Sequence, residues 1–178
     1  MFLKSIKVKL KERAAKLALG TYLTRNTRQS NTEQSLKTVG CIVNLDEFPE
    51  VERLKELQSL LDLRPGGLKI IGFSAQEDAH NLYGQAFFTR ENLAWKGVID
   101  NGDVREFLAM KYDLLVNFYS ADELLLKLLT VQVTSNFNVG FSELDVRLND
   151  LIFQLKLGNF ESFKKELVKY LKVLNKIK

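Results

Sequence analysis

The chain has few of the residues that usually carry catalysis or bind metal. It contains one cysteine, Cys41, and one histidine, His80, among 178 residues. A single cysteine excludes an intramolecular disulfide, and one cysteine with one histidine is too few for a Cys/His zinc site. We therefore expect no metal and a reducing compartment, with the cytoplasm as the default location.

Phosphate-binding and nucleophile motifs are also absent. A dinucleotide site needs the glycines of G-x-G-x-x-G directly after a strand, so that the backbone can approach a pyrophosphate. The first predicted strand is instead followed by NLDEFP at residues 44–49, which has no glycine and two acids that would repel phosphate. No Walker lysine motif or G-x-S-x-G elbow occurs, and His80, in a polar segment, is expected at the surface. We expect no cofactor and no catalytic constellation.

Long apolar runs are missing as well. No run approaches the roughly 20 residues that span a bilayer, and the N-terminus carries lysines throughout rather than the apolar core of a secretory signal. The hydrophobic share of 46% and the charged share of 27% are ordinary for a globular protein. These values favour one folded domain, residues 38–178, preceded by a helix and polar linker over residues 1–37.

The charge of the chain is distributed unevenly. Residues 1–28 contain eight Lys or Arg and one Glu, a net charge of +7, and residues 156–178 carry +5. Because the total is +4, residues 29–155 carry −8. An acidic body with two basic ends bears on the choice of partner rather than on the fold.

Residues 112–141 give the clearest structural signal. A continuous apolar run at residues 114–116 is typical of a strand buried on both faces, and Phe137, Val139 and Phe141 alternate as a second strand. Between them, leucines recur at helical spacing after Ser120, which with Glu123 fits a capping box. This segment predicts two neighbouring parallel strands joined by a helix.

The same alternation of strands and helices extends through the domain. Strands are predicted at residues 38–45, 68–73 and 151–155, and helices follow Pro49, Asp103 and Asn159, with Asp46 expected at the start of the first of these. Residues 85–89 and 94–99 are expected as two short strands that form an antiparallel pair at the edge of the sheet, where a homodimer contact is a further option. Residues 76–82 are expected as a short helix. The pattern predicts a three-layer α/β/α sandwich around a mostly parallel sheet of five to six strands, Rossmann-like or flavodoxin-like.

Residues 1–23 predict a basic amphipathic helix. Leu3, Ile6, Leu10, Ala14 and Leu17 fall on one narrow side. Cations flank that side, with Lys4, Lys7 and Lys11 on one edge and Lys9, Arg13 and Lys16 on the other. Such a helix either docks on its own acidic body or contacts an anionic surface. Among anionic surfaces, RNA ranks slightly ahead of membrane, because the helix has no Trp and one Phe.

A ligand site in an open parallel sheet lies outside the carboxyl ends of the strands. The residues expected there are Asn44, Asp46, Ser74, Ser120 and Gly140. Helix capping is the competing role for Ser120 and Asp46, and Cys41, in the middle of a strand, is expected to be a small core residue.

Two resemblances accompany these patterns. The run YDLLVNFYS, its leucine-rich helix and SNFNVGF resemble the strand, helix and strand segment of heptosyltransferase-type glycosyltransferases, which implies a shared α/β architecture rather than transfer chemistry, because those enzymes need two such domains. The whole chain, from its basic N-terminus through NFNVG to its lysine-rich last helix, resembles a group of short, uncharacterised proteins of Bacteroidota, a likeness that implies no activity.

The sequence therefore favours a non-catalytic α/β binding module. Its basic N-terminal helix is expected to contact RNA, a ribonucleoprotein or another anionic surface. The alternative is a small-molecule enzyme or sensor that binds a nucleotide or sugar nucleotide at the strand ends.

Overall fold

The computed structural model describes residues 2–25, 35–76 and 84–177 and, within the first of these ranges, the side chains of residues 6–24. The predicted helix at residues 76–82, His80 and most of the polar linker therefore lie outside the described residues. The division of the chain into residues 1–37 and 38–178 stays a prediction.

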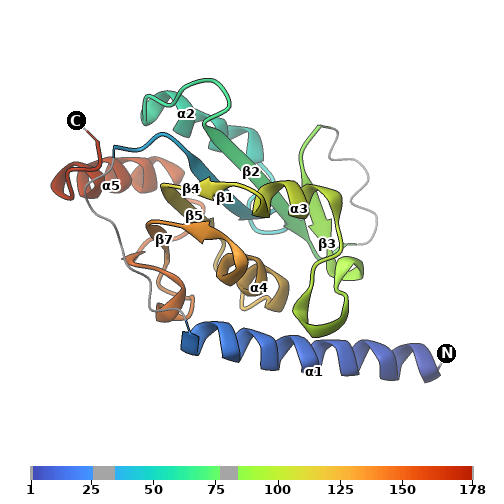
Figure 1. Ribbon diagram of the computed structural model, residues 1–178. Helices are drawn as coiled ribbons and strands as arrows, with labels where there is room; N and C mark the ends of the chain where they lie inside the picture. The colour runs from blue at the N-terminus through green and yellow to red at the C-terminus, as the bar shows by residue number, and fades with distance from the viewer. Residues whose placement is uncertain (1, 26–34, 77–83, 178) are drawn as a thin grey trace.

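A six-stranded sheet forms the centre of the molecule, in the order β3-β2-β1-β5-β7-β8 (Figure 1). All neighbouring pairs of these strands are parallel. The strands are β1 (Val39–Asn44), β2 (Leu68–Ser74), β3 (Phe87–Thr89), β5 (Leu114–Phe118), β7 (Asn138–Phe141) and β8 (Leu151–Phe153). Numbered along the chain as six, they run 3-2-1-4-5-6, which is the order of dinucleotide-binding Rossmann folds and not of flavodoxins. The predicted α/β fold with a mostly parallel sheet is confirmed.

Helices cover both faces of the sheet. On one face, Val39, Cys41 and Val43 of β1 point toward α2 (Glu56–Leu60) with η1 (Val51–Lys55), and toward α5 (Phe160–Val173). On the other, Ile42 and its neighbours point toward α3 (Gly102–Leu108) and α4 (Leu124–Gln132). Successive strand residues alternate between the two cores, as the period of two in a strand requires. The short η3 (Arg90–Asn92), η4 (Trp95–Gly97) and η5 (Val146–Leu148) join the main elements, and β4 (Lys111–Tyr112) and β6 (Thr134–Ser135) form a separate parallel pair.

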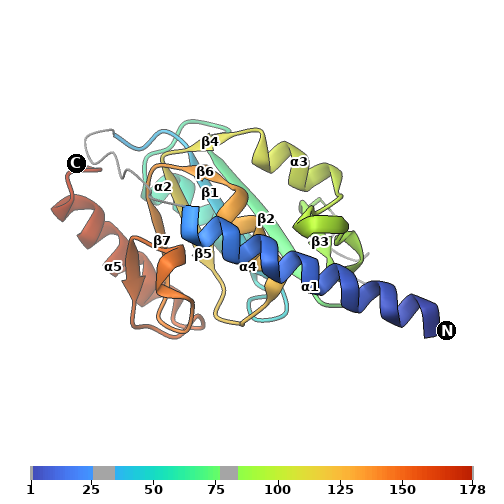
Figure 2. The same cartoon turned by 60° about the horizontal axis from the view of Figure 1, so that its bottom comes forward.

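Helix α1 (Phe2–Arg25) forms an outer layer on the α4 side. It packs on α4 and η4, and its buried residues are Ala15 and Leu19. Figure 2 shows α1 crossing in front of α4, with its N-terminal end extending past the rest of the molecule. The predicted N-terminal helix is confirmed, and its second half packs on the body through Ala15 and Leu19.

Several local predictions are wrong for identifiable reasons. Helix α4 begins at Leu124 with Glu123 as its N-cap, and Ser120 bonds to Glu47 instead of forming a capping box. Helix α3 is capped by Asn101 rather than Asp103, since the Asn101 side chain accepts from the amide of Val104. In each case the cap found is a polar residue two or three positions from the predicted one.

The predicted edge strands at residues 85–89 and 94–99 are half correct. The first contains β3, which pairs with β2 in parallel, but the second contains η4 and a single antiparallel bridge between Leu93 and Ile99. The two segments therefore do not form an antiparallel pair with each other. The cap predicted at Asn159 is confirmed, because its side chain accepts from the amide of Ser162.

Candidate functional site

The strand order reverses between β1 and β5, and this is where a sheet of this type opens a crevice for ligands. The chain leaves β1 through Asn44, Leu45, Asp46 and Glu47, and leaves β5 through Tyr119 and Ser120. Both loops end up at the same edge of the sheet because the strands are parallel. Four of the five predicted ligand residues lie at this edge.

Glu47 occupies the crevice between the two loops. Its carboxylate accepts hydrogen bonds from the amide of Ser120 at 3.0 Å, from the Ser120 hydroxyl at 2.5 Å and from the amide of Ala121 at 3.2 Å. The side-chain amide of Asn44 donates a fourth bond, also at 3.0 Å. Backbone amides between a strand end and the following helix are donors that can hold an anion. Here a carboxylate from the same chain takes them.

Asp46 makes the equivalent contact on the other side, toward β2. Its carboxylate accepts from the hydroxyl of Ser74 at 2.8 Å and from the amide of Ala75 at 2.7 Å. Asp46 therefore does not serve the helix that follows Pro49, which begins as η1 with Glu50 in the N-cap position. Asp46 and Glu47 together tie the loop after β1 to the loops after β2 and β5.

Gly140 lies apart from these residues, against a buried polar network. A Cβ at position 140 would lie 2.4 Å from Nδ2 of Asn149. Asn149 Oδ1 accepts from Asn117 at 2.7 Å, and Asn117 in turn accepts from Thr130 at 2.9 Å. Within the described residues, Nδ2 of Asn149 has no hydrogen-bond partner. The absence of a side chain at Gly140 makes room for Asn149, so its position is explained by packing.

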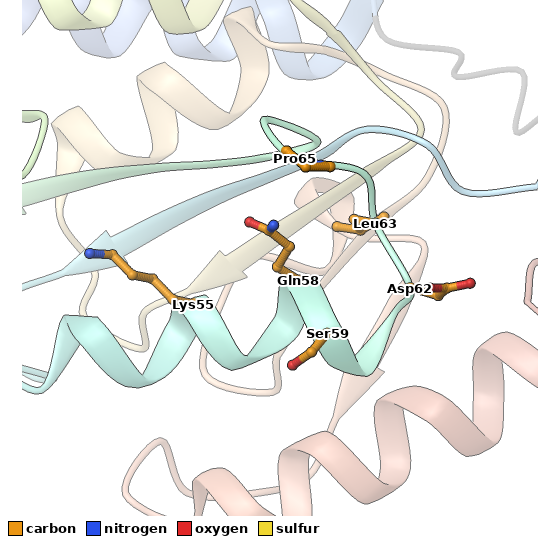
Figure 3. Close-up of a pocket in the computed structure, with 6 residues that line it drawn as sticks. All are labelled: Lys55, Gln58, Ser59, Asp62, Leu63 and Pro65. Carbon is orange, nitrogen blue, oxygen red and sulfur yellow. The ribbon is translucent and has the colours of Figure 1, made fainter.

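Two hollows in the described surface lie at the opposite edge of the sheet. One of about 510 Å³ is lined by residues of η1, α2 and the loop before β2: Lys55, Gln58, Ser59, Asp62, Leu63 and Pro65. In Figure 3, Gln58 and Ser59 point to opposite sides of the helix, and Asp62 points away from both. A smaller hollow of about 170 Å³ adjoins Leu36 and Arg64. In the larger hollow the labelled polar side chains do not point toward one another, whereas a small-molecule site usually has a few convergent polar groups.

Metal-binding geometry is likewise not found among the residues that the structure describes: they contain no group of three or more His, Cys, Asp or Glu side chains placed to hold an ion. Cys41 is fully buried in β1, and burial raises the pKa of its thiol well above the usual range. A thiol in that state is neither a ligand nor a nucleophile at neutral pH.

Helix α1 presents a second candidate surface. Its inward side packs through Ala15 and Leu19, while Ile6, Leu10 and Leu17 are exposed to solvent by 40%, 49% and 69%. At 3.6 residues per turn, these three residues share one side of the helix, opposite Ala15 and Leu19. The apolar side predicted from the sequence therefore exists, but it faces outward. No helix in the described part of the chain is long and apolar enough to cross a membrane.

The cations predicted on α1 surround this outward side. Lys7, Lys9, Arg13 and Lys16 are exposed, and Lys11 donates to the carbonyl of Leu93 at 3.0 Å. Lys4 lies in the first turns of the helix, and its side chain is outside the described set. The ion pairs between described residues all lie elsewhere, on Arg53, Arg90, Arg105, Arg147 and lysines of η1, α4 and α5. Within the described part of the chain, Lys7, Lys9, Arg13 and Lys16 therefore have no carboxylate partner.

A family model, described as a family of unknown function (DUF6913), matches residues 11–174. The chain belongs to this family. The matched region contains the whole sheet, the loops with Asp46, Glu47 and Ser120, and α1 from Lys11 onward. The family brings no activity with it, and the likeness of residues 112–141 to glycosyltransferases stays a prediction. The searches of curated proteins and of solved structures found no match.

Two features of the site were missed by sequence reasoning. Glu47 was considered only as a charge unfavourable to phosphate, although its place directly after a buried strand put it at the same edge as Ser120. The second is the outward direction of Ile6, Leu10 and Leu17, which the small residues Ala15 and Ala18 could have indicated, because closely packed helices favour small residues at the contact.

Proposed function

We propose that this protein is a non-catalytic α/β module that binds an anionic partner through the outward face of α1. The observation that carries the proposal is the set of unpaired cations on that helix. Lys7, Lys9, Arg13 and Lys16 form no ion pair with a described residue, although the body of the protein is acidic. Cations left in this way on one helix create a positive potential that attracts anions.

The anchoring of α1 supports the same proposal. Because Ala15 is fully buried and Leu19 nearly so, the second half of the helix has a fixed orientation on α4 and η4. A fixed helix presents its cations without the entropy cost of ordering a free segment at the moment of binding. The second half of α1 is therefore an ordered part of the protein surface.

The small-molecule alternative receives less support from the geometry. A nucleotide phosphate at the strand ends would meet the carboxylates of Asp46 and Glu47, and would have to displace Glu47 from the amides of Ser120 and Ala121. Losing hydrogen bonds to a charged acceptor costs about 1.5–3 kcal/mol each. The crevice is closed by the protein's own side chains.

The test compares two variants with identical net charge. Lys7→Gln/Arg13→Gln/Lys16→Gln removes three cations from α1, and Lys165→Gln/Lys169→Gln/Lys172→Gln removes three exposed cations from α5. Each is titrated at low salt against a polyuridine oligonucleotide and against phosphatidylcholine vesicles with and without phosphatidylserine. We expect the α1 variant to lose affinity for an anionic probe and the α5 variant to keep it. Equal affinities for the two variants would refute the role of α1.

A further inference from the structure

Building on the proposed role of α1 as the contact helix, we infer that its partner is an anionic lipid surface. The helix would lie in the plane of the membrane, with Ile6, Leu10 and Leu17 among the headgroups and acyl boundary. Interfacial helices of this kind combine an apolar side with flanking Lys and Arg.

Helix α1 has two apolar sides with separate uses. The inward side, Ala15 and Leu19, is covered by α4 and η4, and Gly97 of η4 lies so close that an added Cβ would come within 3.3 Å of Ala18. The outward side is not used by the fold. Leucine and isoleucine side chains exposed on one side of a helix over three turns form an apolar stripe that is unusual for a surface with no partner.

The cations border this outward stripe on both sides. By helical position, Lys7 lies on one flank, and Lys9, Arg13 and Lys16 lie toward the other. Lysine and arginine at such borders extend their aliphatic stems along apolar surface and place their charges in the plane of the headgroups. Each Lys or Arg near an anionic membrane contributes roughly 1 kcal/mol to binding, so three of them change affinity on the order of 100-fold.

The free end of α1 extends this surface beyond the body. Val8 belongs by its helical position to the inward side, yet it is 53% exposed. Figure 2 shows the N-terminal end of α1 projecting past β3. A flat surface can therefore reach the outward side of α1 along its whole length without meeting the domain.

Two other occupants fit the stripe less well. RNA phosphates would pair with the cations, but RNA contacts proteins through its phosphates, hydrogen bonds and base stacking on aromatic side chains. RNA therefore offers no apolar environment to Ile6, Leu10 and Leu17. A second copy of the chain would cover the leucines, but it would bring the Lys and Arg borders of two helices against each other. Like charges at close range disfavour that pairing.

The experiment measures vesicle co-sedimentation of the full chain and separates apolar from electrostatic contributions. Leu10→Ser/Leu17→Ser removes the stripe and leaves every charge in place. Its control, Val146→Ser/Val173→Ser, changes two residues exposed by 67% and 71% on η5 and α5. The α1 charge variant Lys7→Gln/Arg13→Gln/Lys16→Gln is the third protein. Circular dichroism and thermal unfolding establish that all of them fold, which we expect because every changed side chain is exposed.

For phosphatidylserine-containing vesicles, we expect the stripe variant to bind at least about 10-fold more weakly and the charge variant on the order of 100-fold more weakly, with the control unchanged. Full vesicle binding by the stripe variant would overturn the lipid inference. The lipid inference would also fail if the protein bound polyuridine but no vesicles and only the charge variant lost that binding. That result would leave the proposed function intact.

Two further outcomes also overturn the inference. If light scattering shows a dimer that the stripe variant converts to a monomer, the stripe is an interface between copies of the chain. If no anionic probe binds in a way that depends on α1, the proposed function fails together with the lipid inference.

Discussion

At the scale of residues, two adjacent carboxylates connect the loops at the carboxyl ends of the strands. Asp46 bonds to the loop after β2 and Glu47 to the loop after β5, so that each acid satisfies donors from a different strand end. Both carboxylates therefore stabilise this edge of the sheet.

Replacing Glu47 by alanine should destabilise the fold. The change leaves the amides of Ser120 and Ala121 and the side chain of Asn44 without their acceptor, and we expect a loss of about 1–3 kcal/mol in the free energy of unfolding. Urea denaturation measures it. Glu52→Ala, at a carboxylate 71% exposed and paired only with Lys55, should stay within about 0.5 kcal/mol of the wild type. A similar loss for both variants would contradict the stabilising role of the Glu47 hydrogen bonds.

Gly140→Ala should be destabilising for a reason that concerns packing alone. The added Cβ would approach Asn149 Nδ2 to 2.4 Å in a fully buried region, and overpacking of this kind costs about 1–3 kcal/mol. Gly158→Ala is the matched control, since a Cβ there meets nothing within 4 Å. Thermal unfolding of the two variants should differ clearly. A neutral Gly140→Ala would show that Asn149 has room to move.

Cys41 should be unreactive in the native protein. Its thiol is fully buried in the central strand β1, and the raised pKa keeps it protonated, whereas only the thiolate attacks a disulfide reagent. We expect Ellman's reagent to modify Cys41 only after denaturation. Rapid modification under native conditions would mean that β1 opens to solvent.

At the scale of elements, periodicity showed where helices lie but not which side is buried. Leucine spacing in residues 1–23 predicted an amphipathic helix, and the larger apolar residues were taken as its apolar side. The body instead packs against Ala15 and Leu19, and η4 approaches the helix closely at Gly97, next to Ala15 and Ala18. The cap predicted at Ser120 was wrong for a different reason. The Ser120 hydroxyl donates to Glu47, 73 residues away in the sequence, and Glu123 caps the helix instead.

The docking of α1 can be tested by placing a charge on its inward side. Ala15→Glu puts a carboxylate into a fully buried position, and the helix should detach, with a loss of about 1 kcal/mol or more in stability. Thr21→Glu adds the same charge at an exposed position and should have little effect. Tryptic cleavage within α1, followed by mass spectrometry, should accelerate only in Ala15→Glu. Equal cleavage of both variants would mean that α1 is not held by Ala15.

At the scale of the whole molecule, the architecture was predictable because it depends on local patterns. Short apolar runs such as residues 114–116 alternate with helices, and that order fits a parallel sheet between two layers. The strand order and the contacts across the edge were not predictable, because they join residues far apart in the chain. Residues 85–99 were hard to interpret because their structure is a three-residue strand, two 3-10 turns and one isolated bridge.

The charge layout is also a property of the whole molecule. An acidic body could have neutralised the basic helix, and the sequence left that possibility open. The ion pairs of the described residues lie within the body and α5, and Lys7, Lys9, Arg13 and Lys16 of α1 are exposed. The charged side chains of the body therefore pair mainly with one another, whereas the outward side of α1 presents exposed cations beside an apolar stripe.

The most direct test of this claim places an environment-sensitive fluorophore on the outward side of α1. Thr21→Cys lies on the same side as Leu10 and Leu17, one turn beyond Leu17, and the buried Cys41 leaves it as the reactive thiol. A probe at position 21 should shift to shorter wavelength and brighten with phosphatidylserine-containing vesicles, and a probe at Val173→Cys on α5 should not. No change at position 21, or an equal change at both positions, would contradict the account.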